Sequence, residues 1–250
     1  MSIRNLAKGA VILTTASVIT RLIGFFYRIF MSNTIGAEGM GLYQLIMPIY
    51  MLVWSISSSG ISTAVSKITS EECGRRRNCI KTLVSSALFS SAAALFSSIV
   101  VFIFSDIISS KLLGDARCSS LLKILSLCFP FMACGSCIRG YFYGLQKHIY
   151  PACAQVFEQI IRVAVVFTLY PFFFSKGMEY ACAAAVTGVA VGEILSFFLT
   201  VIFLKHSKAA YKETSSASVL NVLAIAFPLT LTRVSASLLS TVENVRLKPL

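Results

Sequence analysis

Residues 10–31 read AVILTTASVITRLIGFFYRIFM, an apolar stretch interrupted by Arg21 and Arg28. The hydrocarbon core of a bilayer is about 30 Å thick, and an α-helix needs about 20 mostly apolar residues to cross it. This stretch has that length, is too long for the core of a signal peptide and has no small-residue cleavage site after it. We therefore expect a retained membrane span whose arginines face a partner or a water-filled cavity.

Six further stretches of similar length follow, and they define the fold class. The predicted spans cover residues 42–65, 82–105, 119–138, 152–174, 181–204 and 219–241. In lipid, a helix satisfies all its backbone hydrogen bonds within one segment. The sequence thus predicts an all-α integral membrane protein, a polytopic helical bundle. We expect a six-helix amino-terminal lobe over residues 1–204, a cytoplasmic linker over 205–218 and the first helix of an incomplete second lobe over 219–250.

The composition agrees with this class. Of the 250 residues, 56% are hydrophobic and 13% charged, whereas about a quarter of a soluble domain is charged. The net charge of +12 would suggest nucleic acid in a soluble chain, but here the basic residues lie mainly between apolar stretches. There they set topology against an anionic cytoplasmic leaflet, so we expect membrane lipids and no nucleic acid as partners.

The loop charges predict the orientation. On the other side of the membrane we place only Lys111, Arg117 and Lys176. Twelve basic residues fall on the amino-terminal side: Arg4, Lys8, Lys67, Arg75, Arg76, Arg77, Lys81, Arg139, Lys147, Lys205, Lys208 and Lys212. By the positive-inside rule, the amino terminus lies in the cytoplasm and the chain is a multi-pass protein of the cytoplasmic membrane.

Polar residues in the first span lie on one helical face. Thr14, Ser17, Arg21, Gly24 and Arg28 are spaced by three or four residues and form a small, cationic stripe. Arginine suits phosphate or pyrophosphate because its planar fork stays charged and donates parallel hydrogen bonds. The stripe predicts a substrate-binding cavity for an anion. The alternative is that Arg28 reaches the membrane interface and Arg21 is neutralised by an internal carboxylate.

The fifth and sixth spans carry the other ionisable groups. Glu158 and Arg162 are spaced i, i+4, which favours an ion pair that is either structural or part of a cavity lining. Glu193 follows Gly188 and Gly192, whose spacing permits close helix approach. Glu193 either binds a coupling cation or proton, or neutralises Arg21 or Arg162.

The seventh span repeats the pattern of the first. Thr230, Arg233 and Ser237 share one face, as expected for a parallel repeat of two six-helix halves that bind substrate between them. Arg233 is therefore a further candidate for the binding cavity, and coincidence is the alternative.

No residues indicate enzyme chemistry. The sequence contains no nucleophile with a neighbouring base, no cluster with metal-ligand spacing and no glycine-rich phosphate loop, so we expect neither an enzyme nor a cofactor or metal. Most of the eight cysteines lie in apolar stretches, where thiols serve as packing residues. Cys134 and Cys137 have redox spacing without a second pair, so we expect packing there as well.

Two pairs of motifs go beyond generic membrane patterning. The first is TRLIGFFYRI at 20–29 with IGAEGMGLYQ at 35–44, and the second is RGYFYGLQK at 139–147 with QVFEQIIRV at 155–163. With them the chain resembles the stage V sporulation protein B group of polysaccharide exporters, in the superfamily that also holds multidrug and toxin extruders and lipid II flippases.

The resemblance implies two pseudo-symmetric six-helix lobes with alternating access. It also implies outward flipping of undecaprenyl-pyrophosphate-linked oligosaccharides or peptidoglycan precursors, in cell-wall or spore cortex synthesis. The flippases' cavity arginine and glycine match Arg21 and Gly24, while their second arginine is offset by one position from Arg28. Family members are about twice as long, so the chain resembles an amino-terminal lobe plus one helix.

The leading hypothesis is thus a flippase for an anionic lipid-linked saccharide, working with a second lobe or as a homodimer. The first alternative is a cation-coupled multidrug exporter of the same superfamily, with Glu193 as the coupling site. The second is a membrane scaffold for wall synthesis that transports nothing and uses its loops, such as Arg75 to Arg77.

Overall fold

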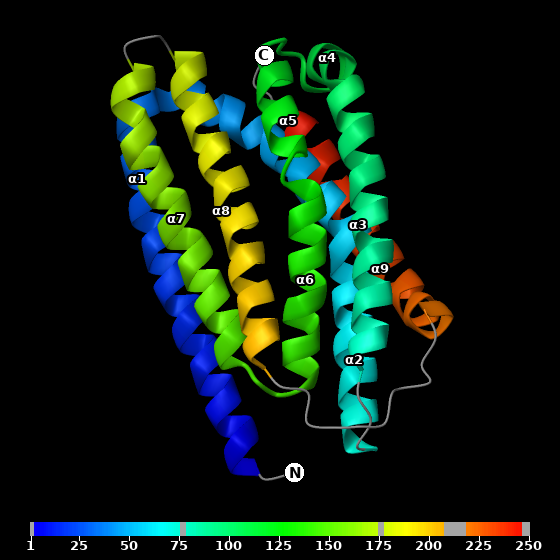
Figure 1. The fold of residues 1–250 in the computed structure, drawn as a ribbon. Helices are drawn as coiled ribbons and strands as arrows, with labels where there is room; N and C mark the ends of the chain where they lie inside the picture. Colours follow the sequence, from blue (N-terminus) through cyan, green and yellow to red (C-terminus); the bar gives the residue numbers. More distant parts are fainter. Residues whose placement is uncertain (1–2, 76–78, 175–177, 208–218, 247–250) are drawn as a thin grey trace.

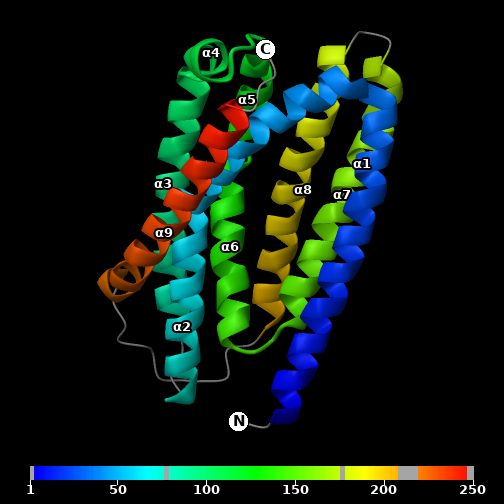
Figure 2. The same ribbon diagram turned by 180° about the vertical axis from the view of Figure 1, so that it is seen from behind.

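The computed structural model describes residues 3–75, 79–174, 178–207 and 219–246, and these are almost entirely helical (Figures 1 and 2). Four helices are long and apolar enough to cross a membrane, or five with a pair bent at a short break. The expected all-α membrane bundle is confirmed. The ends that carry Lys8, Arg75, Lys81, Lys147 and Lys205 lie together, away from the end that carries Lys111 and Arg117. Arg76, Arg77, Lys176, Lys208 and Lys212 lie outside the described residues.

Helix α1 (Ile3–Trp54) supplies the first span and part of the second. It breaks at Gly36, where φ is 75° and ψ is −179°, a conformation that suits glycine because no Cβ is present. After the break the helix crosses one end of the bundle and turns back (Figure 2). The residues between the first two predicted spans are therefore helical on both sides of Gly36.

The second span is a composite. It consists of the end of α1, a π-helical turn η1 (Ser55–Ser59) and α2 (Gly60–Gly74), so it extends beyond the expected end at residue 65. The four serines of the turn are buried and pack inside the bundle. The turn joins the oblique part of α1 to the upright α2 (Figure 2).

The third and fourth spans form the next pair. Helix α3 (Ile80–Ile103) leads through α4 (Ser105–Ile107) and the π-helical η2 (Ile108–Leu113) to α5 (Cys118–Ser126). Helix α6 (Phe129–Gly144) then continues α5 at an angle of 45°. Pro130 lies in the first turn of α6, where proline is tolerated because its missing N–H would have no partner within the helix. A single span at 119–138 is therefore two helices.

Helices α7 (Ile149–Phe174) and α8 (Met178–His206) form the most extensive helix pair. A Cβ added at Gly188 would lie 2.9 Å from the carbonyl oxygen of Arg162, and one at Gly192 would lie 3.2 Å from that of Glu158. The close approach predicted from the glycine spacing is confirmed. Because the glycines face α7, they bring the backbone that carries Glu158 and Arg162 against α8.

Helix α9 (Val219–Arg246) packs on α2, and α2 packs in turn on α6. Gly60 contacts Thr230 of α9, and Gly144 of α6 leaves room for Thr69 of α2. Val222 and Ala226 of α9 join the core cluster around α2. The division between two lobes at 205–218 stays a prediction.

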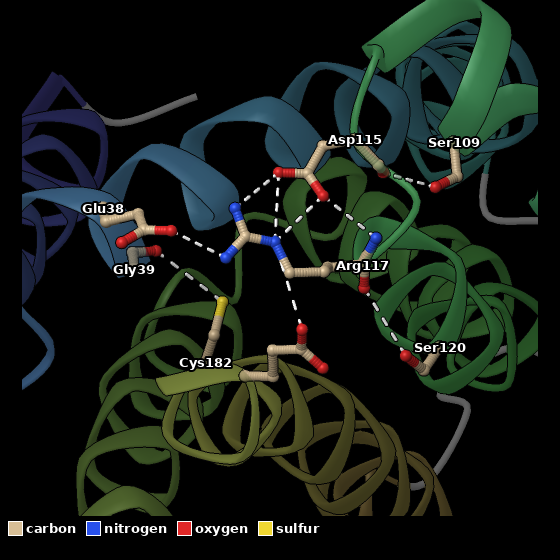
Figure 3. A network of polar contacts seen from close by, with 8 residues as sticks. Glu38, Gly39, Ser109, Asp115, Arg117, Ser120 and Cys182 are labelled. Carbon is tan, nitrogen blue, oxygen red and sulfur yellow. Dashed lines mark hydrogen bonds and ion pairs between the residues drawn. The ribbon is translucent and has the colours of Figure 1, made fainter. Parts of the chain in front are cut away.

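Arg117 ties three segments together at the end of the bundle opposite Lys8 (Figure 3). Its guanidinium donates to Glu38 at 2.7 Å and to Asp115 at 2.8 Å, and lies 4.0 Å from Glu179. These hydrogen bonds raise the pKa of Arg117. Glu38 directly follows the break in α1, and Glu179 begins α8, so the network fixes the turn of α1 over the bundle.

The α7–α8 contact predicts that glycine-to-alanine substitutions destabilise the protein to different extents. Gly188→Ala would place a methyl group against backbone, which cannot move as a side chain can, and should lower the free energy of unfolding by about 1–3 kcal/mol. Gly192→Ala has more space and should have a smaller effect. Gly41→Ala is the control, because no atom lies within 4 Å of its added Cβ. Apparent melting temperatures in detergent should fall in the order Gly41→Ala, Gly192→Ala, Gly188→Ala. Equal values for all three would contradict the contact.

Candidate functional site

A cavity of about 400 Å³ lies between α1 and α7, and we refer to it as the arginine cavity. It contains all three first-span candidates, Arg21, Gly24 and Arg28. Its full lining is Arg21, Gly24, Phe25, Tyr27, Arg28, Met31, Met40, Tyr43, Gln159 and Arg162. The structure therefore places the second half of the polar stripe, from Arg21 to Arg28, along one wall of a cavity, while Thr14 and Ser17 lie outside its lining.

Arg21 and Arg28 are both exposed, and neither forms an ion pair within the described part of the chain. The internal carboxylates do not neutralise Arg21, since Glu158 pairs with Arg162 and Glu193 accepts a hydrogen bond from Tyr50. Gly24 lies between them on the same face, and a Cβ there would stand 3.4 Å from Nε2 of Gln159. Two guanidinium groups are consequently available to an anion, with the Gln159 amide beside them.

A second cavity of about 470 Å³ adjoins the first, and we refer to it as the carboxylate cavity. Tyr43 and Arg162 line both cavities, so these two side chains lie between them. The lining of the carboxylate cavity is Tyr43, Met47, Tyr50, Met51, Trp54, Arg139, Tyr143, Pro151, Gln155, Glu158, Arg162, Val189 and Glu193. The cavities thus join segments of α1, α6, α7 and α8.

The Glu158–Arg162 ion pair is present, with Nη2 of Arg162 2.8 Å from Oε1 of Glu158. The side chains are only 18% and 19% exposed. Both residues also line the carboxylate cavity. The pair lets α7 carry two charges at membrane depth, which would be costly for either alone.

Glu193 is buried, with 4% of its surface exposed. Its Oε1 accepts a hydrogen bond from the hydroxyl of Tyr50, and its Oε2 has no hydrogen-bonding partner within the part of the chain that the structure describes. Of the partners that sequence suggested, neither Arg21 nor Arg162 forms an ion pair with Glu193. A buried carboxylate oxygen beside a cavity is a place where a proton or a small cation gains stability.

The structure does not bring Arg233 to the other arginines. Arg233 is exposed on α9, and neither cavity includes it. Thr230 of the same face packs against Gly60 of α2, and the side chain of Ser237 lies outside those described. A binding role for Arg233 stays a prediction.

Sequence reasoning missed three lining residues. Arg139 was assigned to a loop as a topology determinant, but it lies in α6 and lines the carboxylate cavity. Tyr143 lies four residues after Arg139 on the same helical face, and this i, i+4 spacing is visible in the sequence. Tyr50 carried no such pattern, since only the fold brings it to Glu193, which is 143 residues away.

The cysteines and the possible metal ligands offer little chemistry among the described residues. All eight cysteines are free thiols, and most are buried among apolar side chains, as expected for packing residues. Among the described residues, no group of three or more histidine, cysteine, aspartate or glutamate side chains could hold a metal ion.

Comparison with known proteins places this geometry in a family. The sequence pattern of the "Polysaccharide biosynthesis protein" family matches residues 6–249. The chain belongs to this family. It is 30% identical over 210 residues to stage V sporulation protein B of Bacillus subtilis (strain 168), which covers 83% of the chain and 40% of that protein. It is 26% identical over 224 residues to the lipid II flippase MurJ of the same bacterium, covering 82% of the chain and 40% of the flippase.

The chain therefore spans about two fifths of the length of these curated relatives. Among solved structures, a MOP superfamily transporter from Pyrococcus furiosus superposes with a TM-score of 0.75 at 16% identity. That superposition covers 92% of this chain and 53% of the transporter, and a multidrug MATE structure gives a TM-score of 0.62 over a similar share. These likenesses show a transporter fold of which the chain forms one part.

The ion pair on α7 predicts a measurable coupling. Glu158→Gln, Arg162→Gln and the double variant should form a cycle with a coupling free energy of about 1–3 kcal/mol, between values typical of exposed and fully buried pairs. Arg162→Gln should be the most destabilising, because it leaves a carboxylate at membrane depth without its partner. Chemical unfolding in detergent would measure this, and additive effects would show that the pair contributes nothing.

Proposed function

We propose that this chain forms the amino-terminal lobe of a flippase that moves an anionic lipid-linked saccharide from the inner to the outer leaflet. The observation that carries the proposal is the pair of unpartnered arginines, Arg21 and Arg28, on one wall of the arginine cavity. Charged groups at membrane depth are costly and generally serve a ligand or a pathway. Here they would attract the substrate's pyrophosphate.

The neighbouring groups suit the rest of such a substrate. Arginine forks donate paired hydrogen bonds to phosphate oxygens, and the amides of Gln155 and Gln159 can bond sugar hydroxyls. The lipid tail would stay outside in the hydrocarbon, at an open side of the lobe. The charge asymmetry of the loops supports an amino terminus in the cytoplasm, the side on which the substrate would be loaded.

The relatives support the substrate class. One is called a lipid II flippase and another a stage V sporulation protein, and the matched family carries the description of polysaccharide biosynthesis. For this chain we infer an undecaprenyl-pyrophosphate-linked oligosaccharide or peptidoglycan precursor, used in wall or cortex synthesis. A second lobe, or a second copy of this chain, would close the open side of the cavity and allow alternating access.

Glu193 is our candidate for coupling to a proton or cation gradient. Its free oxygen Oε2 is buried beside the carboxylate cavity, and its other oxygen is held by Tyr50. Arg162, which lines both cavities, connects this group with the substrate arginines. Neutralising Glu193 would then change the electrostatic potential that the substrate meets.

Arg21 gives the direct test. Arg21→Ala should insert normally and reduce flipping by about 10- to 100-fold, the loss expected for charge-assisted hydrogen bonds of about 1.5–3 kcal/mol. Arg21→Lys keeps the charge without the fork and should retain part of the activity. Flipping is measured with the full-length protein in proteoliposomes, from the outer-leaflet exposure of a labelled lipid-linked substrate. Unimpaired transport by Arg21→Ala would remove the cavity role.

Two further experiments distinguish the flippase from its two alternatives, the scaffold and the multidrug exporter. Arg75→Ala changes an arginine that is 67% exposed and far from the cavities, so flipping should be unchanged. A wall-synthesis scaffold would show the opposite, with Arg75 required and Arg21 dispensable. A multidrug exporter would make its deletion strain hypersensitive to cationic drugs, whereas a flippase would cause a wall or spore defect without that phenotype.

Glu193→Gln tests the coupling role. Glutamine still accepts the Tyr50 hydrogen bond but cannot take up or release a proton, so substrate binding should persist while transport no longer responds to an imposed ion or pH gradient. Binding and gradient-driven flux are measured on the same proteoliposome preparation. An unchanged gradient response would exclude Glu193 as the coupling group.

A further inference from the structure

A second concave surface lies on the outer side of the α1–α7 pair. This groove has a volume of about 520 Å³, and its lining is almost wholly apolar. Its floor includes the small side chains Ala16 and Ala152, and its walls include Val11, Ile19 and Phe157. Most other apolar surface of a membrane helix is convex, so a groove of this size offers a lipid chain more contact than its surroundings.

The groove and the arginine cavity occupy opposite faces of α1. Val11, Thr15 and Ile19 follow each other at intervals of four residues, and at about 100° per residue this row lies on the side of the helix away from Arg21, Gly24 and Arg28. A lipid whose phosphates bind Arg21 would have to wrap around α1 to reach the groove. The occupant is therefore a different molecule from the flipped substrate.

Lys8 gives the groove a charged end. It precedes Ile12 by four residues and Thr15 by seven, so it lies on the groove face of α1, and its side chain is exposed. Within the described chain Lys8 has no ion pair, whereas Lys147 nearby donates to the hydroxyl of Ser207 at 3.0 Å. Gly9 packs directly on the ring of His148, which brings α1 and the start of α7 together beside Lys8.

The dimensions match one leaflet. Lys8 and Ile19 are eleven residues apart, which corresponds to about 16 Å along an α-helix. Half of a hydrocarbon core of about 30 Å is about the same length. From Lys8 to Ile19, the α1 side of the groove therefore spans about the hydrocarbon of one leaflet, with the basic residue at the headgroup end.

We propose that the α1–α7 groove binds an anionic phospholipid of the cytoplasmic leaflet, with one acyl chain between the helices and its phosphate at Lys8. Basic sites at the cytoplasmic ends of transmembrane helices hold anionic headgroups in this manner. The assignment to the cytoplasmic leaflet follows the proposed orientation, and binding itself does not depend on flipping activity. The bound lipid would support the helix α1 that carries Arg21 and Arg28 on its other face.

Photocrosslinking in the full-length protein tests this site. A benzophenone amino acid replaces Phe157 in the groove or, as control, Phe96 on α3, which is 69% exposed on the bundle surface. The protein is reconstituted in vesicles of equal parts phosphatidylglycerol and phosphatidylcholine with identical acyl chains. After irradiation, mass spectrometry compares the two lipid adducts at each position. We expect phosphatidylglycerol to be enriched about fivefold at position 157, and not at position 96, from the contribution of one lysine at an anionic surface.

Charge variants complete the test. Lys8→Gln should abolish the enrichment at position 157, whereas Lys81→Gln, an equal charge loss at the same end of the bundle, should leave it unchanged. Equal adduct ratios at positions 157 and 96 would overturn the proposal, as would an enrichment that survives Lys8→Gln. Adducts at position 157 to a protein segment or to an isoprenoid tail would overturn it too, by identifying another occupant.

Discussion

Helices α7 and α8 meet at Gly188 and Gly192, where no side chain separates their backbones. This contact sets the rotation of α7. With its glycine-facing side held against α8, α7 directs Glu158 and Arg162 toward the carboxylate cavity, where they pair with each other. The hydrocarbon around the bundle makes that pairing necessary, since either charge alone would be costly. The polar interior thus depends on a close contact between two glycines of α8 and the backbone of Glu158 and Arg162.

Helix α1 separates two environments. One face carries arginines into a cavity, and the other forms an apolar groove with α7. The helix can serve both because its far end is fixed: Gly36 permits the turn, and Arg117 holds Glu38 beside it. The fixed end of α1 and the phospholipid proposed for the groove would both keep Arg21 and Arg28 in position for an anion.

The chain corresponds to part of each relative with which it was compared. It spans two fifths of the curated family members and about half of the solved transporters whose fold it shares. Arg21 and Arg28 line the arginine cavity without an ion pair among the described residues, which supports the proposed role in binding an anion. Helix α9 packs on α2 at Gly60, so a movement of α9 would be transmitted directly to the second span.

The sequence by itself determined the class of the protein, its predicted spans and the i, i+4 ion pair of α7, because length, hydropathy and helical spacing are local properties. It also indicated the arginine stripe and the glycine contact, since both follow one helix face. The turn at Gly36 and the bend between α5 and α6 come from the structure, because chain geometry and packing decide where a helix bends. Only the tertiary structure decided that Tyr50 pairs with Glu193, that Arg139 lines a cavity and that Arg233 lies apart from Arg21. Those relations join residues on different helices, and helix packing sets them.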